Sequence, residues 1–89
     1  MLVPTQTVLI YFEQILNDIQ APNGVFVRIE QIGDDGSATL TFGRAESDDH
    51  QFRYLGRIVL IVDEHVANCL KAKTLDVEET DKGAQLILK

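Results

Sequence analysis

The sequence has little cysteine, no long apolar run and no basic leader. These absences argue against a disulfide within the chain, a membrane-spanning helix and a signal peptide. Its one cysteine, Cys69, cannot form a disulfide within the chain, so nothing indicates an oxidising compartment. No apolar stretch approaches the roughly 20 residues that a membrane-spanning helix needs. The N-terminus also lacks the basic region of a signal peptide, and we therefore expect a cytoplasmic protein.

Basic side chains are scarce as well. The 89 residues include 14 acidic and 8 basic side chains, which gives a formal net charge of −6. Binding to a phosphate backbone depends on lysine and arginine, so nucleic acid and anionic membranes are poor partners for this chain. The acidic excess serves solubility. It leaves a cation, a basic surface on another protein, or no charged partner at all as the options.

Apolar periodicity predicts a helix and a β-hairpin in the first half of the chain. Apolar residues recur at helical spacing over residues 6–20, and Thr5 precedes them as a helix N-cap. Alternating apolar residues then predict strands at residues 25–32 and 37–42. A Gly-Asp-Asp-Gly turn at residues 33–36 joins these two strands.

The second half predicts more strands and a second helix. A continuous run of β-branched and leucine side chains at residues 58–62 predicts a central strand that is buried on both faces. Asp63 follows as the N-cap of a short helix over residues 64–72. Antiparallel hairpins with helices at one side, rather than alternating β-α-β units, indicate a single α+β domain over residues 1–89. The other predicted strands are 52–55, 74–79 and 84–89.

The segment from Gly56 to Leu88, GRIVLIVDEHVANCLKAKTLDVEETDKGAQLIL, resembles the closing segment of the HesB/IscA-like, or A-type, iron–sulphur carriers. Members of that family have a V-D pair after a strand, an L-D-Y-V-E segment and a glycine before the last strand. The resemblance implies a single HesB-like domain, a small mixed β-sandwich of hairpins with two helices. The matching residues are Val62-Asp63, Leu75-Asp76 with Glu78-Glu79, and Gly83, with Gly33 and Gly36 as turn glycines.

The family's three cluster-binding cysteines have no counterpart in this sequence. The first would fall at Asp34, and the sequence stops at Lys89, before the place of the family's C-G-C tail. Cys69 stands in the second predicted helix, where the family usually has an aromatic or apolar residue. Iron–sulphur clusters require thiolate ligands, and one thiol cannot hold a cluster within one chain. We therefore expect no cofactor.

Cys69 and Asp34 remain the candidates for a metal ligand. We expect Cys69 to share the inner face of its helix with Val66 and Leu70, and so to be a small core residue rather than a reactive thiol. Asp34, with Asp35 beside it, offers carboxylates that suit a hard cation. A turn of this composition forms readily without metal, so we assign no metal site.

The composition of residues 43–51, which is rich in acidic residues and poor in apolar ones, predicts an exposed acidic loop. Glu46, Asp48, Asp49 and His50 form the densest set of possible ligands in the sequence. Their spacing matches no metal-binding pattern, so we interpret the segment as solvated. If this surface has a role, Asp48, Asp49 and His50 are available to recognise a basic partner.

No enzyme motif is present in the sequence. We therefore predict a non-enzymatic adaptor or regulatory protein, with an A-type-like scaffold that has lost cluster ligation, that binds a protein partner in iron–sulphur or sulphur metabolism. Two alternatives stay open. One is a metal or iron–sulphur carrier that uses Cys69 across a homo-oligomer, or carboxylates. The other is an unrelated small α+β interaction protein.

Overall fold

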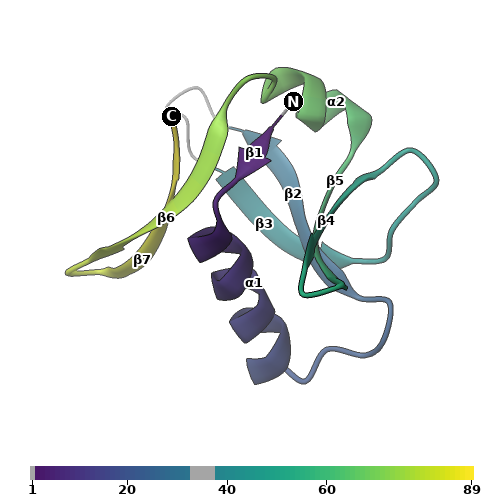
Figure 1. Ribbon diagram of the computed structural model, residues 1–89, viewed down its shortest axis with the longest axis horizontal. Helices are drawn as coiled ribbons and strands as arrows, with labels where there is room; N and C mark the ends of the chain where they lie inside the picture. The colour runs from purple at the N-terminus through teal and green to yellow at the C-terminus, as the bar shows by residue number, and fades with distance from the viewer. Residues whose placement is uncertain (1, 33–37) are drawn as a thin grey trace.

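The computed structural model describes residues 2–32 and 38–89. The described residues form two helices, α1 (Gln6–Asp18) and α2 (Glu64–Cys69), and seven strands. The Gly33–Gly36 turn, with Asp34, lies outside the described residues. The strands in Figure 1 are β1 (Val3–Pro4), β2 (Phe26–Ile32), β3 (Ala38–Gly43), β4 (His50–Tyr54), β5 (Arg57–Val62), β6 (Thr74–Thr80) and β7 (Gly83–Leu88).

The strands form two sheets. The larger sheet has the order β3-β2-β5-β4, in which β2 and β5 run parallel and the outer strands are antiparallel to their neighbours. In the smaller sheet, β1 pairs parallel with β6, which pairs antiparallel with β7. The predicted small mixed α+β arrangement is therefore confirmed, although the two parallel pairings and the strand β1 were not predicted.

Strand β5 is one of the two inner strands of the larger sheet, and it is buried as the sequence predicts. Residues Val59 to Val62 are completely buried, so both faces of the strand are covered. β-Branched and leucine side chains suit such a position, because they carry no polar atom that would need a partner. Complete burial of one such side chain stabilises the fold by about 1.5–3 kcal/mol.

Helix α1 contacts strands of both sheets and fills the space between them. Val8, Phe12 and Leu16, four residues apart, are completely buried on one face of the helix. The helix ends at Asp18, two residues before the predicted end, and Gln20 adopts a φ of 53° as the chain turns away. Neither helix of the described residues is long and apolar enough to cross a membrane.

The N-cap of α1 also fastens the helix to the smaller sheet. Thr5 Oγ1 accepts a hydrogen bond from the Val8 N–H at 3.2 Å, as predicted, and donates one to Asp76 Oδ1 at 2.8 Å. Asp76 accepts another from the Val77 N–H. These two hydrogen bonds, with Lys89 nearby, lower the pKa of Asp76. One carboxylate thus positions the first turn of α1 against β6.

Helix α2 is shorter than predicted. Asp63 is its N-cap, as predicted, and accepts a hydrogen bond from the Val66 N–H at 2.8 Å. The helix ends at Cys69, because the chain bends after Leu70 and Ala72 adopts a φ of 64°. Val66 and Leu70 remain in the core, so one short turn of helix closes the end of the larger sheet.

Candidate functional site

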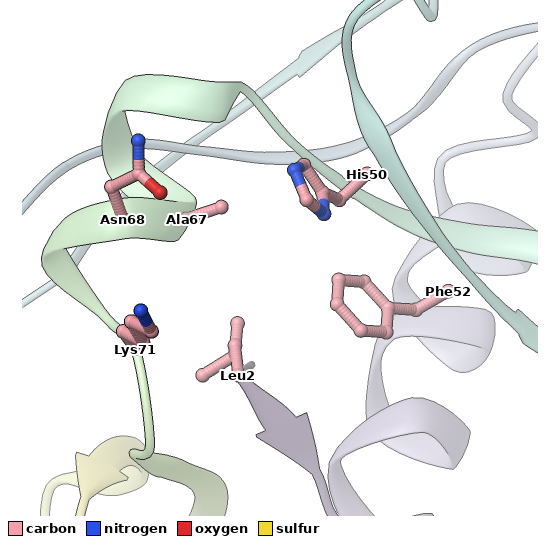
Figure 2. A pocket seen from close by; sticks show the side chains of 6 residues that line it. All are labelled: Leu2, His50, Phe52, Ala67, Asn68 and Lys71. Atoms are coloured by element: carbon pink, nitrogen blue, oxygen red, sulfur yellow. The ribbon is translucent and has the colours of Figure 1, made fainter.

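A small pocket opens between α2 and β4, over the N-terminal segment that leads into β1. Its volume is about 110 Å³. Figure 2 shows side chains from the three segments facing a common space. The described residues that line it are Leu2, His50, Phe52, Ala67, Asn68 and Lys71.

The secondary structure explains why these side chains meet. His50 and Phe52 are two apart on β4, so they lie on the same face of the strand. Leu2 is held below α2 because the Val3 N–H donates to the Lys73 carbonyl at 2.9 Å. Three regions distant in sequence thus form one pocket.

The pocket combines an apolar floor with a polar rim. Leu2 is only 2% exposed, and Phe52 and Ala67 are half-buried. His50, Asn68 and Lys71 are exposed at the opening (Figure 2). Ligand pockets for drug-sized molecules usually measure about 300–1,000 Å³, so this one suits a single small group rather than a large cofactor.

Cys69 is exposed, and the prediction that it is a core residue is wrong. Successive residues are about 100° apart around a helix, so Ala67 and Cys69 lie on opposite flanks of Val66. The Ala67 flank faces β4 and the pocket, whereas the Cys69 flank faces solvent. Helical spacing alone did not show which flank of Val66 the sheet covers.

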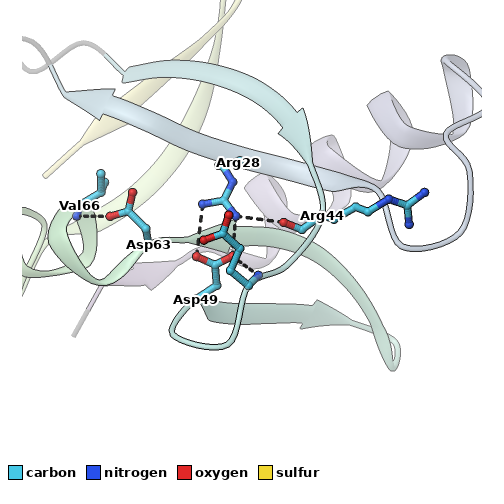
Figure 3. A network of polar contacts seen from close by, with 6 residues as sticks. Arg28, Arg44, Asp49, Asp63 and Val66 are labelled. Atoms are coloured by element: carbon cyan, nitrogen blue, oxygen red, sulfur yellow. Dashed lines mark hydrogen bonds and ion pairs between the residues drawn. The ribbon is translucent and has the colours of Figure 1, made fainter.

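A partly buried ion pair holds the acidic segment before β4 in place (Figure 3). Arg28 donates two hydrogen bonds to Asp49, from Nη1 to Oδ1 at 3.2 Å and from Nη2 to Oδ2 at 2.5 Å. Arg28 also donates to the Arg44 carbonyl, and the Glu46 N–H donates to Asp49. The Asp49 side chain is 0% exposed, so the prediction that it belongs to a solvated partner surface is wrong.

The three residues predicted as a partner surface are therefore separated. Asp48 is exposed on the loop, Asp49 is inside the ion pair with Arg28, and His50 begins β4 and lines the pocket. The physical reason is that Arg28 reaches from β2 across to the loop, a contact between residues 21 apart that no local pattern reveals.

Comparison with solved structures identifies the fold. No protein-family model and no curated protein sequence matches the chain. Escherichia coli SufA, described as involved in the biosynthesis of iron–sulphur clusters, superposes with a TM-score of 0.74 over 99% of this chain and 83% of its own, at 16% identity. IscA with a [2Fe-2S] cluster superposes with a TM-score of 0.63 over 100% of this chain and 84% of its own, at 14% identity.

This chain has the HesB/IscA-like fold. The resemblance in the sequence is thereby confirmed at the level of fold.

The described part of this HesB/IscA-like domain gathers no group of three or more histidine, cysteine or acidic side chains that is suited to hold a metal ion. Asp34, the position that the resemblance matches to the first cysteine, lies outside the described residues. Cys69 lies at the surface of α2.

Sequence reasoning missed most of the pocket in the HesB/IscA-like domain. His50 was singled out only as part of the acidic segment, and Phe52 only as a strand residue. Asn68 lies on α2 and Lys71 follows two residues after its end, and no pattern in the sequence marked either of them. Leu2 could not be predicted as a pocket residue from the sequence, because its position depends on pairing with a segment about 70 residues away.

The ion pair of Asp49 makes stability depend on pH. Burial raises the pKa of Asp49, but hydrogen bonds from Arg28 and the Glu46 N–H outweigh it, so the pKa is lowered overall. A carboxyl with a lowered pKa in the folded state stabilises the fold above its unfolded pKa of about 3.9. That contribution is lost as the pH falls through the lowered pKa of the folded state.

Asp49→Asn is expected to reduce the free energy of unfolding by about 1–2 kcal/mol at neutral pH, because it leaves the partly buried Arg28 guanidinium without its counter-charge. Urea unfolding at about pH 7 and about pH 3 measures this. The difference in the free energy of unfolding between variant and wild type should be smaller at the lower pH, because the Asp49 carboxylate then contributes less. The control is Asp48→Asn, at an exposed neighbour, and an equal loss in both variants would contradict the assignment.

Proposed function

We propose that this chain is a non-enzymatic adaptor or regulatory protein that binds a protein partner in iron–sulphur or sulphur metabolism. One observation carries the proposal. The fold is that of SufA and IscA, whereas the sequence contains a single cysteine. Within these 89 residues, the fold is accompanied by fewer thiols than a cluster needs.

The number of thiols argues against cluster binding by these 89 residues. A [2Fe-2S] cluster is usually held by four cysteine thiolates. One copy of the chain supplies one thiol and two copies supply two. This fold with a single thiol in these 89 residues supports a role in binding proteins rather than in carrying a cluster.

The pocket between α2 and β4 is the surface that best suits partner binding. It has an apolar floor at Leu2 and Phe52, on which a partner side chain can rest, and polar groups around its rim. Interfaces commonly anchor one buried side chain in such a pocket and surround it with polar contacts. The net charge of −6 favours solubility, because it opposes non-specific association through the rest of the surface.

The test is anaerobic affinity capture from the native host, read by quantitative mass spectrometry. We expect an iron–sulphur or sulphur-transfer protein to be enriched on the wild-type chain and lost on Lys71→Glu. Lys73→Glu is the matched control, because it makes the same change of charge two residues away and outside the pocket. No enrichment on wild type would contradict the proposal, and equal enrichment on all three chains would contradict the pocket as the binding surface.

The second candidate function is a metal or cluster carrier that shares Cys69 across an oligomer. The observation that favours it is the exposure of Cys69, which makes the thiol available to a second copy. Under the adaptor proposal, anaerobic addition of iron and sulphide should produce no protein-bound visible absorbance. Absorbance that is present in wild type and absent in Cys69→Ser would establish the carrier instead. Because Cys69 is exposed, the serine variant should fold normally.

A further inference from the structure

We propose that the pocket between α2 and β4 binds an aliphatic carboxylate, with a short branched apolar group on its floor and the carboxylate at Lys71. The inference goes beyond the proposed function and stands without it, because such a ligand can bind whether or not the chain has a protein partner.

The size and floor of the pocket select the apolar part of the ligand. The volume of about 110 Å³ leaves room for a small group rather than for a large ligand. Leu2, Phe52 and Ala67 supply the apolar wall, and Figure 2 shows the Leu2 side chain and the Phe52 ring facing the same space. A branched group of four or so carbon atoms fills such a space and displaces its water, which apolar walls hold weakly.

The residues at the rim of the pocket favour a ligand with a negative charge. Lys71 lines the pocket, no acidic residue is among the described residues that line it, and Lys71 takes part in no ion pair within the described ranges. The Asn68 amide and the His50 ring stand at the same opening and add hydrogen-bonding groups (Figure 2). An ammonium group without a counter-ion beside an apolar floor suits a carboxylate, since charge-assisted hydrogen bonds are the stronger ones.

A second pocket shows the contrast. It lies between α1 and β6 and has a volume of about 180 Å³. Glu79 lines it, and no lysine or arginine is among its described lining residues, so an anion is repelled there. The two pockets therefore differ in the charge of their described lining residues, with a lysine in the first and a glutamate in the second.

Two sources can supply this chemistry, a free branched-chain acid and the C-terminal residue of a peptide chain. Isovalerate represents the first, and N-acetyl-leucine represents the second. Their uncharged amides, isovaleramide and N-acetyl-leucinamide, keep the apolar group and remove the charge, so they isolate the contribution of the carboxylate.

The experiment is titration of the ¹⁵N-labelled chain with each of the four compounds, followed by amide chemical shifts. We expect saturable shifts at Phe52, Ala67, Asn68 and Lys71, with a Kd on the order of millimolar for so small a ligand. The residues of the second pocket should not shift. Tighter binding of isovalerate identifies a free acid as the ligand, and tighter binding of N-acetyl-leucine identifies a chain end.

Lys71→Gln should weaken binding of the carboxylates about threefold to fivefold, whereas Lys73→Gln should weaken it less than about 1.5-fold. Both lysines are exposed, so both variants should retain the wild-type spectrum. Three results would overturn the inference: no saturable shifts with either carboxylate, equal binding of the amides, or equal weakening by the two substitutions. None of these depends on the capture experiment, so failure of the proposed function is recognised separately.

Discussion

Replacement of Leu60 by aspartate is expected to leave the chain unfolded. Leu60 is completely buried at the middle of β5, where Val27 and Phe52 pair with it from the strands on either side. A carboxylate at this position has no cation to pair with and no water to solvate it. An uncompensated buried charge costs several kcal/mol, against a total stability of about 5–15 kcal/mol for a typical domain.

The measurement is far-ultraviolet circular dichroism with a one-dimensional proton spectrum. We expect Leu60→Asp to lose the dispersed methyl and amide signals of a folded core. Gln51→Asp is the control, because it places the same charge on the exposed face of the adjacent strand β4. Ile58→Asp should have a smaller effect, since Ile58 is only half-buried. A cooperative, near-native melting transition in Leu60→Asp would contradict the central position of β5.

Replacement of Phe12 by alanine is expected to cost about 3–5 kcal/mol of unfolding free energy. Phe12 is completely buried in the middle of α1, which packs against strands of both sheets. Its ring also lies 5.8 Å from that of Tyr11, centroid to centroid. Truncation removes apolar contacts and leaves a cavity that a helix held between two sheets cannot close by shifting.

Urea denaturation monitored by circular dichroism measures this loss. Gln14→Ala, at an exposed position of the same helix, is the control for helix propensity and should change stability by less than about 0.5 kcal/mol. If both variants lose the same amount, or if Phe12→Ala loses less than about 1 kcal/mol, α1 does not dock through this face.

Most elements of the fold were predictable, because local patterns encode them. The caps Thr5 and Asp63 each accept the expected hydrogen bond, and the β-branched run of β5 is buried as its composition indicates. Pairing was harder to predict. Parallel partners such as β2 and β5 are far apart in the sequence, and a two-residue strand such as β1 is too short to show any alternation.

The candidate site was predictable only in fragments. Helical spacing placed Cys69 near Val66 and Leu70, but the covered flank of α2 is set by β4, which spacing does not reveal. The sequence predicts Asp49 to be one of several solvated acidic residues, whereas in the structure Arg28 on β2 forms an ion pair with it. Both errors arise because burial of a side chain depends on elements that are distant in the sequence.

The pairing of β1 with β6 also affects when the molecule completes its fold during synthesis. Pro4 pairs with Leu75, which the ribosome adds 71 residues later. At about 5–20 residues per second, the first strand waits roughly 4–14 s for its partner. Until then Leu2 and the apolar face of α1 lack part of their cover, so the nascent chain is the stage at which this protein is most open to chaperones and to aggregation.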